Sequence, residues 1–195
     1  MRHLLLVLAL GFAAAAQNVI DRVAVVVGNQ VITESEVVLE ARLTAFLNRQ
    51  PLDLGPAQRR AAAERLVDQQ LIRNEMQVGG YPMPAQAEGD AILRQYRQGN
   101  YTSLPAFRAA LAQYELTEDE VKGRLLWQAA ALRFTEQRFR MSMPAAAAQP
   151  AAQSAGGSSG GSIDASADRV EDPMDAWLKQ ARAGTRIQFK KGAFQ

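Results

Sequence analysis

The sequence predicts a mainly α-helical protein, a helical bundle with a small antiparallel sheet made by an N-terminal hairpin and a C-terminal strand. The segment RVAVVVGNQVIT, residues 22–33, has two β-branched runs around Gly28-Asn29, which is typical of a hairpin. Residues 34–140 carry apolar side chains at helical spacing between recognisable helix caps. Near the end of the chain, Ile187 and Phe189 alternate with polar residues, which predicts a strand with one buried face.

The predicted hairpin leads directly into a helix. Both faces of the hairpin are apolar, so we expect the sheet to be covered on both sides. Thr33 and Glu36 have the spacing of a capping box, in which each side chain bonds to the other residue's backbone N–H. The helix that they begin is expected to extend to about Arg49.

The second predicted helix covers residues 57–78 and is the best candidate for the centre of the bundle. Pro56 suits the first turn of a helix, and Gly79-Gly80 should end it. A connector, Tyr81-Pro-Met-Pro, separates this helix from a shorter one at residues 85–98, which Gly99-Asn100 should stop.

Two further helices complete the predicted bundle. Ser103 caps the first, and its inward residues are predicted to be Phe107, Leu111 and Tyr114. Thr117 and Glu120 form a second capping box, from which a long helix runs toward Arg140. Near-heptad spacing predicts one apolar stripe on this helix, formed by Val121, Leu125, Leu132 and Phe139. We expect Leu39, Leu71, Leu125 and Leu132 to lie in the core.

The final part of the chain follows a segment with little to bury. Residues 144–171 are rich in Ala, Gly and Ser and predict a disordered linker. Residues 172–195 then predict a helix up to about Ala183 and a strand over residues 186–194. An isolated helix and strand bury too little to be stable, so we expect them to dock on the domain at residues 17–143. The strand would extend the hairpin, and Trp177 would pack its helix against the bundle.

The first sixteen residues have the layout of a secretory signal peptide. MRH is a short basic start, Leu4 to Phe12 is apolar, and Ala13 to Ala16 offers an Ala-x-Ala cleavage site. An uncleaved membrane anchor is the alternative, although the apolar run is short for a membrane span. We therefore expect export, with residues 1–16 removed and the mature chain soluble.

The composition argues against several function classes. Removal of residues 1–16 leaves 21 Lys and Arg against 20 Asp and Glu, a balance that does not favour nucleic acid as a partner. The sequence has no Cys, and its single His, His3, lies in the predicted signal peptide. The exported chain therefore has no thiol nucleophile, no imidazole base and no nitrogen or sulfur metal ligand of the usual kind. We expect no metal and no cofactor.

Several motifs resemble the N-terminal domain of SurA-type periplasmic chaperones. These are RVAVVVGNQVITESEV, the helical segments ERLVDQQLIRNEM and YELTEDEVKGRL, and the ending DAWLKQARAGTRIQF. The resemblance covers about Val19 to Arg140 and Asp172 to Phe194, and it implies periplasmic chaperone-like binding. Family members usually carry parvulin-type prolyl isomerase domains where this chain has its Ala/Gly/Ser-rich segment, so the resemblance does not imply isomerase activity here.

The leading functional hypothesis is an ATP-independent periplasmic holdase that binds unfolded outer-membrane or secreted polypeptides. Such a protein needs an exposed apolar groove, and the sequence has no GxxxxGK[ST] loop for ATP. Met adapts to varied partners and Tyr tolerates partial hydration, which makes such residues suitable for a groove. The candidate peptide-binding residues are Met76, Tyr81, Met83, Tyr96, Tyr101, Phe107 and Tyr114, each of which could instead serve in core or connector packing.

Two other hypotheses remain open at this stage. The chain could be a dedicated envelope assembly or interaction module with one partner. An enzyme is less favoured, whether a residual prolyl isomerase or a carboxylate-based hydrolase. The pairs Glu34/Glu36 and Glu118/Glu120 lie in predicted capping boxes, where acidic residues stabilise a helix N-terminus without any catalytic role. The oligomeric state is left open.

Overall fold

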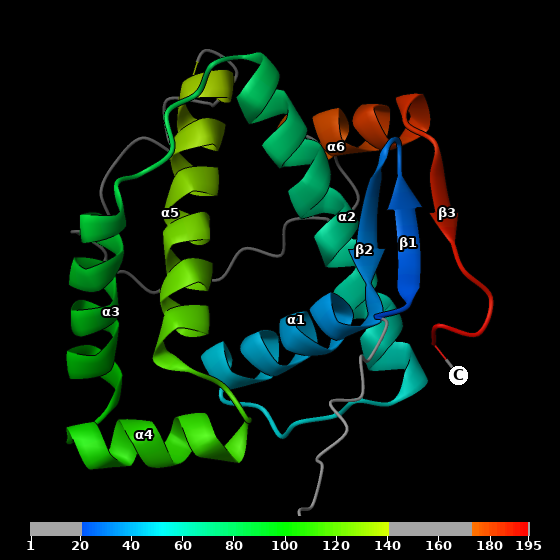
Figure 1. The fold of residues 1–195 in the computed structure, drawn as a ribbon. Helices are drawn as coiled ribbons and strands as arrows, with labels where there is room; N and C mark the ends of the chain where they lie inside the picture. Colours follow the sequence, from blue (N-terminus) through cyan, green and yellow to red (C-terminus); the bar gives the residue numbers. More distant parts are fainter. Residues whose placement is uncertain (1–20, 141–172, 195) are drawn as a thin grey trace, which may run out of the picture.

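The computed structural model describes residues 21–140 and 173–194. The predicted signal peptide and the predicted linker, residues 144–171, lie outside the described residues. The predicted fold class is confirmed, because helices dominate the described part and a small antiparallel sheet accompanies them (Figure 1). The elements are β1 (Val23–Val27), β2 (Gln30–Thr33), α1 (Glu34–Leu47), α2 (Pro56–Val78), α3 (Gln86–Asn100), α4 (Leu104–Gln113), α5 (Glu118–Phe139), α6 (Pro173–Gly184) and β3 (Ile187–Phe189).

The sheet joins the two ends of the described chain. Its strand order is β2-β1-β3, with β1 antiparallel to both neighbours, so the C-terminal strand extends the hairpin as predicted (Figure 1). Strand β3 is shorter than the predicted 186–194. Gly192 adopts a φ of 94° and the Ala193 N–H donates to the Lys190 carbonyl, so the chain turns back after the strand. This turn brings the ring of Phe194 to 6.1 Å from that of Phe189.

The prediction that both faces of the sheet are covered is wrong. Antiparallel partners share a face, so Val25 and Ile32 lie on one face and Val26 and Val31 on the other. Val25 and Ile32 are buried, whereas Val31 is 54% exposed. The three-stranded sheet packs its buried face on helices, and among the described residues Val31 on the other face remains open to water.

Helices α1, α2 and α6 pack against the buried face of the sheet. Trp177 of α6 packs against this core and also against Phe134 of α5, with ring centroids 5.8 Å apart. The guanidinium of Arg182 binds the Asp68 carboxylate at 2.6 Å and the Glu64 carboxylate at 2.8 Å, both on α2. The guanidinium carbon of Arg60 lies 3.4 Å from the centroid of the Phe189 ring. The predicted docking of the chain's ending on the first domain is therefore present.

Helix ends agree with the predicted caps at most positions. Thr33 and Thr117 form complete capping boxes with Glu36 and Glu120 at the starts of α1 and α5. Helix α1 ends at Leu47, two residues before the predicted end. Helix α3 continues through the predicted stop at Gly99-Asn100, because the Asn100 side chain donates to the Tyr96 carbonyl at 2.7 Å and so supports the last turn.

Leu132 is a correction to the predicted core, since its side chain is 60% exposed. It continues the stripe of Val121 and Leu125, which pack against α1 and α4. Further along α5 the buried direction changes to a second stripe at Trp127, Ala130 and Phe134, which faces α2 and α6. The predicted stripe therefore fails at Leu132, where α5 passes from one cluster to the other, whereas Phe139, its last member, packs against the second cluster.

Candidate functional site

The seven candidate residues fall into two separate groups and do not line one groove. The first group surrounds Phe46 of α1. The ring centroids of its members lie 5.6 to 6.2 Å from that of Phe46, and the members are Tyr96, Tyr101, Phe107 and Tyr114. These residues come from α3, α4 and the segments that follow them, so the group fastens those helices to α1.

The hydroxyl of Tyr114 serves the fold. The Tyr114 hydroxyl donates to the Gln50 carbonyl at 2.8 Å, which ties the end of α4 to the loop after α1. Burial raises the pKa of Tyr96 above its ordinary value, and neighbouring Tyr101 adds to the shift. Phe107 is fully buried, so its side chain belongs to the core and is not open to a bound peptide.

The second group lies in a different core cluster, which contains Phe134 of α5. The ring of Tyr81 meets that of Phe134 edge-on, with centroids 5.0 Å apart. Met76 is buried in the same cluster, so it too is a core residue. Met83, in the connector before α3, is 55% exposed and is the most accessible of the seven candidates.

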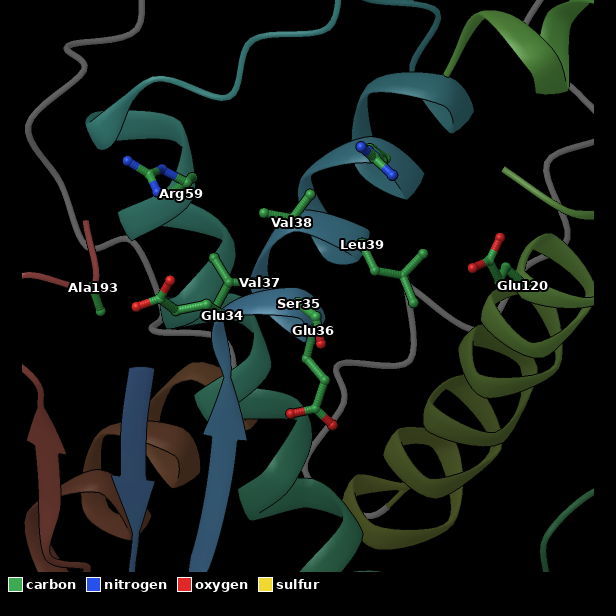
Figure 2. Close-up of a pocket in the computed structure, with 10 residues that line it drawn as sticks. Glu34, Ser35, Glu36, Val37, Val38, Leu39, Arg59, Glu120 and Ala193 are labelled. Carbon is green, nitrogen blue, oxygen red and sulfur yellow. The ribbon is translucent and has the colours of Figure 1, made fainter. Parts of the chain in front are cut away.

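A pocket lies instead over the N-terminal half of α1. Its volume is about 470 Å³. Figure 2 shows Val38 and Leu39 of α1 at its centre, with Arg59 of α2 on one side and Glu120 of α5 on the other. The full lining is Glu34, Ser35, Glu36, Val37, Val38, Leu39, Arg42, Arg59, Glu120 and Ala193. The pocket therefore brings together α1, α2, α5 and the residues after β3.

A second pocket of about 230 Å³ continues from the first into the angle between α1, α2 and α5. Both pockets are lined by Glu36, Leu39 and Glu120. The second adds the apolar side chains Leu43, Leu66 and Trp127. We call the two pockets together the α1 groove.

Local sequence explains how the acidic side chains of the α1 groove are held. Glu36 accepts the Thr33 N–H at 2.8 Å, and Glu120 accepts the Thr117 N–H at 2.7 Å. Each carboxylate therefore closes the first turn of its own helix, as the capping-box prediction requires. Glu36 and Glu120 lie in the groove because the first turns of α1 and α5 border it.

A buried carboxylate, Glu40, forms part of the wall of the groove. Glu40 is 3% exposed and is the one charged residue among the buried side chains of the described chain. The guanidinium of Arg124 binds both of its carboxylate oxygens, at 2.9 and 3.1 Å. Arg65 donates at 3.1 Å and Gln69 at 3.2 Å. Glu40 thus joins α1 to α2 and α5.

Sequence reasoning missed Glu40, although a signal was present. Glu40 lies three residues after Val37 and one before Ala41, which are both buried, so helical spacing places it on the inward face of α1. An acidic residue on such a face requires cationic partners, because a lone buried charge is strongly unfavourable. Arg65 and Arg124 are far away in sequence and could not be chosen as those partners in advance.

An arginine also covers one end of the groove. The guanidinium carbon of Arg73 lies 4.0 Å from the centroid of the Trp127 ring. Burial lowers the pKa of Arg73 from its ordinary value, and the charge of Arg124 lowers it further. The cation and the indole ring attract one another through the ring's quadrupole.

The groove offers apolar contact area bordered by charged side chains. The Glu40 carboxylate in its wall is engaged by Arg65, Gln69 and Arg124, and its apolar residues provide contact area. Among residues 21–140 and 173–194, no three Asp, Glu, His or Cys side chains are grouped so that they could hold a metal ion. Over the same ranges, no helix combines the length and the apolar character needed to cross a membrane.

Comparisons with known proteins do not assign a family. A scan of protein-family models and a search of curated proteins found no match to this chain. The resemblance to SurA-type chaperones therefore stays a prediction based on the quoted motifs.

Proposed function

We propose that this protein is an ATP-independent periplasmic chaperone that holds unfolded outer-membrane or secreted polypeptides. The observation that supports this proposal is the α1 groove, where apolar side chains from α1, α2 and α5 border a cavity open to solvent. The larger pocket, about 470 Å³, falls within the range of about 300–1,000 Å³ typical of ligand sites. The proposal assigns no catalytic step and no cofactor to the chain.

The physical argument concerns what an unfolded chain offers. Such a chain exposes apolar side chains and unpaired backbone groups, and contact with an apolar groove removes part of that surface from water. Leu39 and Leu43 give the groove an apolar surface without strict shape selection. Glu36, Glu120 and Arg73 border this surface with charges of both signs, so a polypeptide of mixed composition can find polar partners at the edges.

The resemblance to SurA-type chaperones adds independent support from the sequence. It implies that the ending DAWLKQARAGTRIQF closes the first domain, and α6 and β3 occupy that position. The assignment to the periplasm depends on residues 1–16, whose pattern predicts export.

Aggregation of several unrelated unfolded proteins, followed by light scattering without ATP, tests the holdase proposal. The mature chain should suppress aggregation of several clients. Leu39→Ser should weaken this suppression, because it removes an apolar surface common to both pockets, whereas Leu104→Ser should not, because Leu104 is exposed on α4 and lines neither pocket. Urea unfolding of both variants controls for stability.

Four outcomes would count against the proposal. The proposal would be rejected if the chain suppressed aggregation of none of the clients. It would also be rejected if Leu39→Ser and Leu104→Ser weakened suppression equally. Activity toward a single client would favour the dedicated interaction module. Acceleration of a proline-limited refolding reaction by the purified chain would instead indicate a prolyl isomerase.

A further inference from the structure

Strand β3 leaves one edge of the sheet unpaired. It is the outermost strand in the order β2-β1-β3, and no other described helix or strand lies beyond it (Figure 1). An unpaired edge presents a row of backbone donors and acceptors on which another strand can form. The edge is separate from the α1 groove, since none of the β3 residues lines either pocket of that groove.

The register identifies which backbone groups of β3 are free. The Gly28 N–H donates to the Arg186 carbonyl at 2.8 Å, and the Lys190 N–H donates to the Ala24 carbonyl at 2.9 Å. Between them, Gln188 is aligned with Val26. In an antiparallel ladder, successive residues point their backbone groups to opposite sides. The N–H and C=O groups of Ile187 and Phe189 therefore point away from β1.

The opposite edge of the sheet is less suitable for another strand. Strand β2 passes directly into α1, and the Thr33 N–H is taken by the Glu36 carboxylate at 2.8 Å. The capping box therefore ends this edge after Val31. Of the two edges, that of β3 offers the longer run of free backbone groups.

The charged side chains in the chain segment that contains β3 are all basic. Residues 176–195 contain five Lys and Arg and no Asp or Glu. Arg182 is bound by Glu64 and Asp68 of α2. Arg186 precedes the strand and Lys190-Lys191 follow it, all exposed, and within the described residues no carboxylate forms an ion pair with these three. Both ends of the free edge are therefore positive.

We propose that the outer edge of β3 binds an extended acidic polypeptide segment as a fourth strand. Backbone hydrogen bonds to Ile187 and Phe189 would hold the segment, and carboxylates would pair with the flanking cations. A second copy of this chain is disfavoured at the same edge, because antiparallel pairing about Gln188 would place Arg186 opposite Lys190 of the other copy. This interaction is separate from the proposed holdase function and uses a different surface.

Direct peptide binding to the mature chain tests the proposal. The probe is a fluorescent peptide of alternating Val and Glu, followed by fluorescence anisotropy at low salt. One control peptide has Lys in place of Glu. Another keeps the Glu residues but carries N-methyl groups on alternate residues, which removes the strand-pairing donors and leaves the charge intact. Only the unmodified acidic peptide should bind, and added salt should weaken its binding.

Hydrogen exchange locates the bound peptide. The outward-pointing amides of Ile187 and Phe189 should exchange more slowly in the complex, whereas that of Gln188 should change little. Lys190→Gln/Lys191→Gln should weaken binding roughly threefold to tenfold, and the matched pair Arg94→Gln/Arg140→Gln, exposed elsewhere on the molecule, should not.

The test distinguishes strand addition from simple attraction between charges. Equal binding of the N-methylated peptide would overturn the proposal in favour of a general polyanion surface, such as one for anionic lipid or nucleic acid. Unchanged exchange at Ile187 and Phe189 would also overturn it. Neither result would bear on aggregation suppression through the α1 groove, which is measured separately.

Discussion

A single residue, Glu40 of α1, connects three helices through its buried carboxylate. Its carboxylate receives hydrogen bonds from Arg124, Arg65 and Gln69, and also from Thr44 of its own helix. A buried ion pair gains little over apolar packing, but removing one partner leaves the other charges buried without compensation. Glu40 is therefore a position where one substitution should loosen three helices.

Replacement of Glu40 by Ala should lower the free energy of unfolding by about 3–5 kcal/mol. Arg124, whose side chain is 13% exposed, loses the partner that compensates its burial, and the more exposed Arg65 loses its ion pair. Urea unfolding followed by circular dichroism measures the loss. Glu115→Ala is the control, since Glu115 is 69% exposed and pairs with Arg42 at the surface. It should cost less than about 1 kcal/mol. Equal losses of stability in the two variants would show that the buried ion pairs of Glu40 stabilise the fold no more than a surface ion pair.

Two leucines on α5 provide a second residue-scale comparison. Leu125 is buried against α1 and α4, whereas Leu132, on the same stripe, is exposed. Leu125→Ala should cost about 2–5 kcal/mol and Leu132→Ala less than about 0.5 kcal/mol. Thermal unfolding of both variants measures the difference. A large loss of stability in Leu132→Ala would mean that α5 is rotated about its own axis so that Leu132 faces the core.

At the scale of elements, the docking of α6 and β3 decides whether the sheet is complete. Trp177 contacts both the core under the sheet and the core around Phe134, so it couples α6 to α2 and α5. Trp177→Ala should lower the free energy of unfolding by about 1.5–3 kcal/mol through lost apolar burial. Val78→Ala, an exposed position on α2, should cost less than about 0.5 kcal/mol. Chemical denaturation distinguishes the two.

Deletion of residues 172–195 is the stronger test of the same docking. It removes β3 and exposes the edge of β1 together with the α2 surface under Trp177. The truncated protein should melt at a clearly lower temperature than the full chain. Identical melting temperatures would show that residues 172–195 contribute nothing to the stability of the rest of the protein.

Acid should weaken the contact between α6 and α2. Burial alone would raise the pKa of Glu64, but hydrogen bonds from Arg182 and Arg60 outweigh it and hold that pKa below its ordinary value of 4.5. As the pH falls below about 4.5, the unfolded chain takes up this proton before the folded chain does, so stability decreases. Stability measured between about pH 5 and pH 3 should therefore decline. In Arg182→Gln the decline should be smaller, and an unchanged decline would assign it to other groups.

At the scale of the whole molecule, the chain leaves α5 and returns at α6 in the same region. Phe139 near the end of α5 and Met174 at the start of α6 pack against one cluster. The intervening segment therefore does not need its full length to connect them. Deleting residues 155–160 should change the melting temperature little, since doubling a loop's length costs only about 0.6 kcal/mol. A marked destabilisation would assign a structural role to that segment.

The sequence predicted much of the fold, but less of the candidate site. The capping boxes at Thr33 and Thr117 marked two helix starts because caps are local and each needs only residues three apart. The candidate binding residues were chosen because they are Met, Tyr or Phe. The identity of a residue does not determine whether its side of the helix faces a neighbouring helix or the solvent. Phe107, chosen as a binding residue, is therefore fully buried. Leu39, expected in the core, is partly buried against the core around Phe46 and also lines the groove.

The sequence by itself determined the order of helices and strands, the hairpin turn at Gly28 and the return of an apolar ending that had to dock somewhere. These features follow from interactions between near neighbours and from the need to bury apolar area. Only the tertiary structure decided that Glu40 meets Arg65 and Arg124, that Leu132 faces water and that α1, α2 and α5 border a groove. Such features depend on the angle between packed helices and on which face of each helix is in contact. Both are set by contacts between residues far apart in the chain.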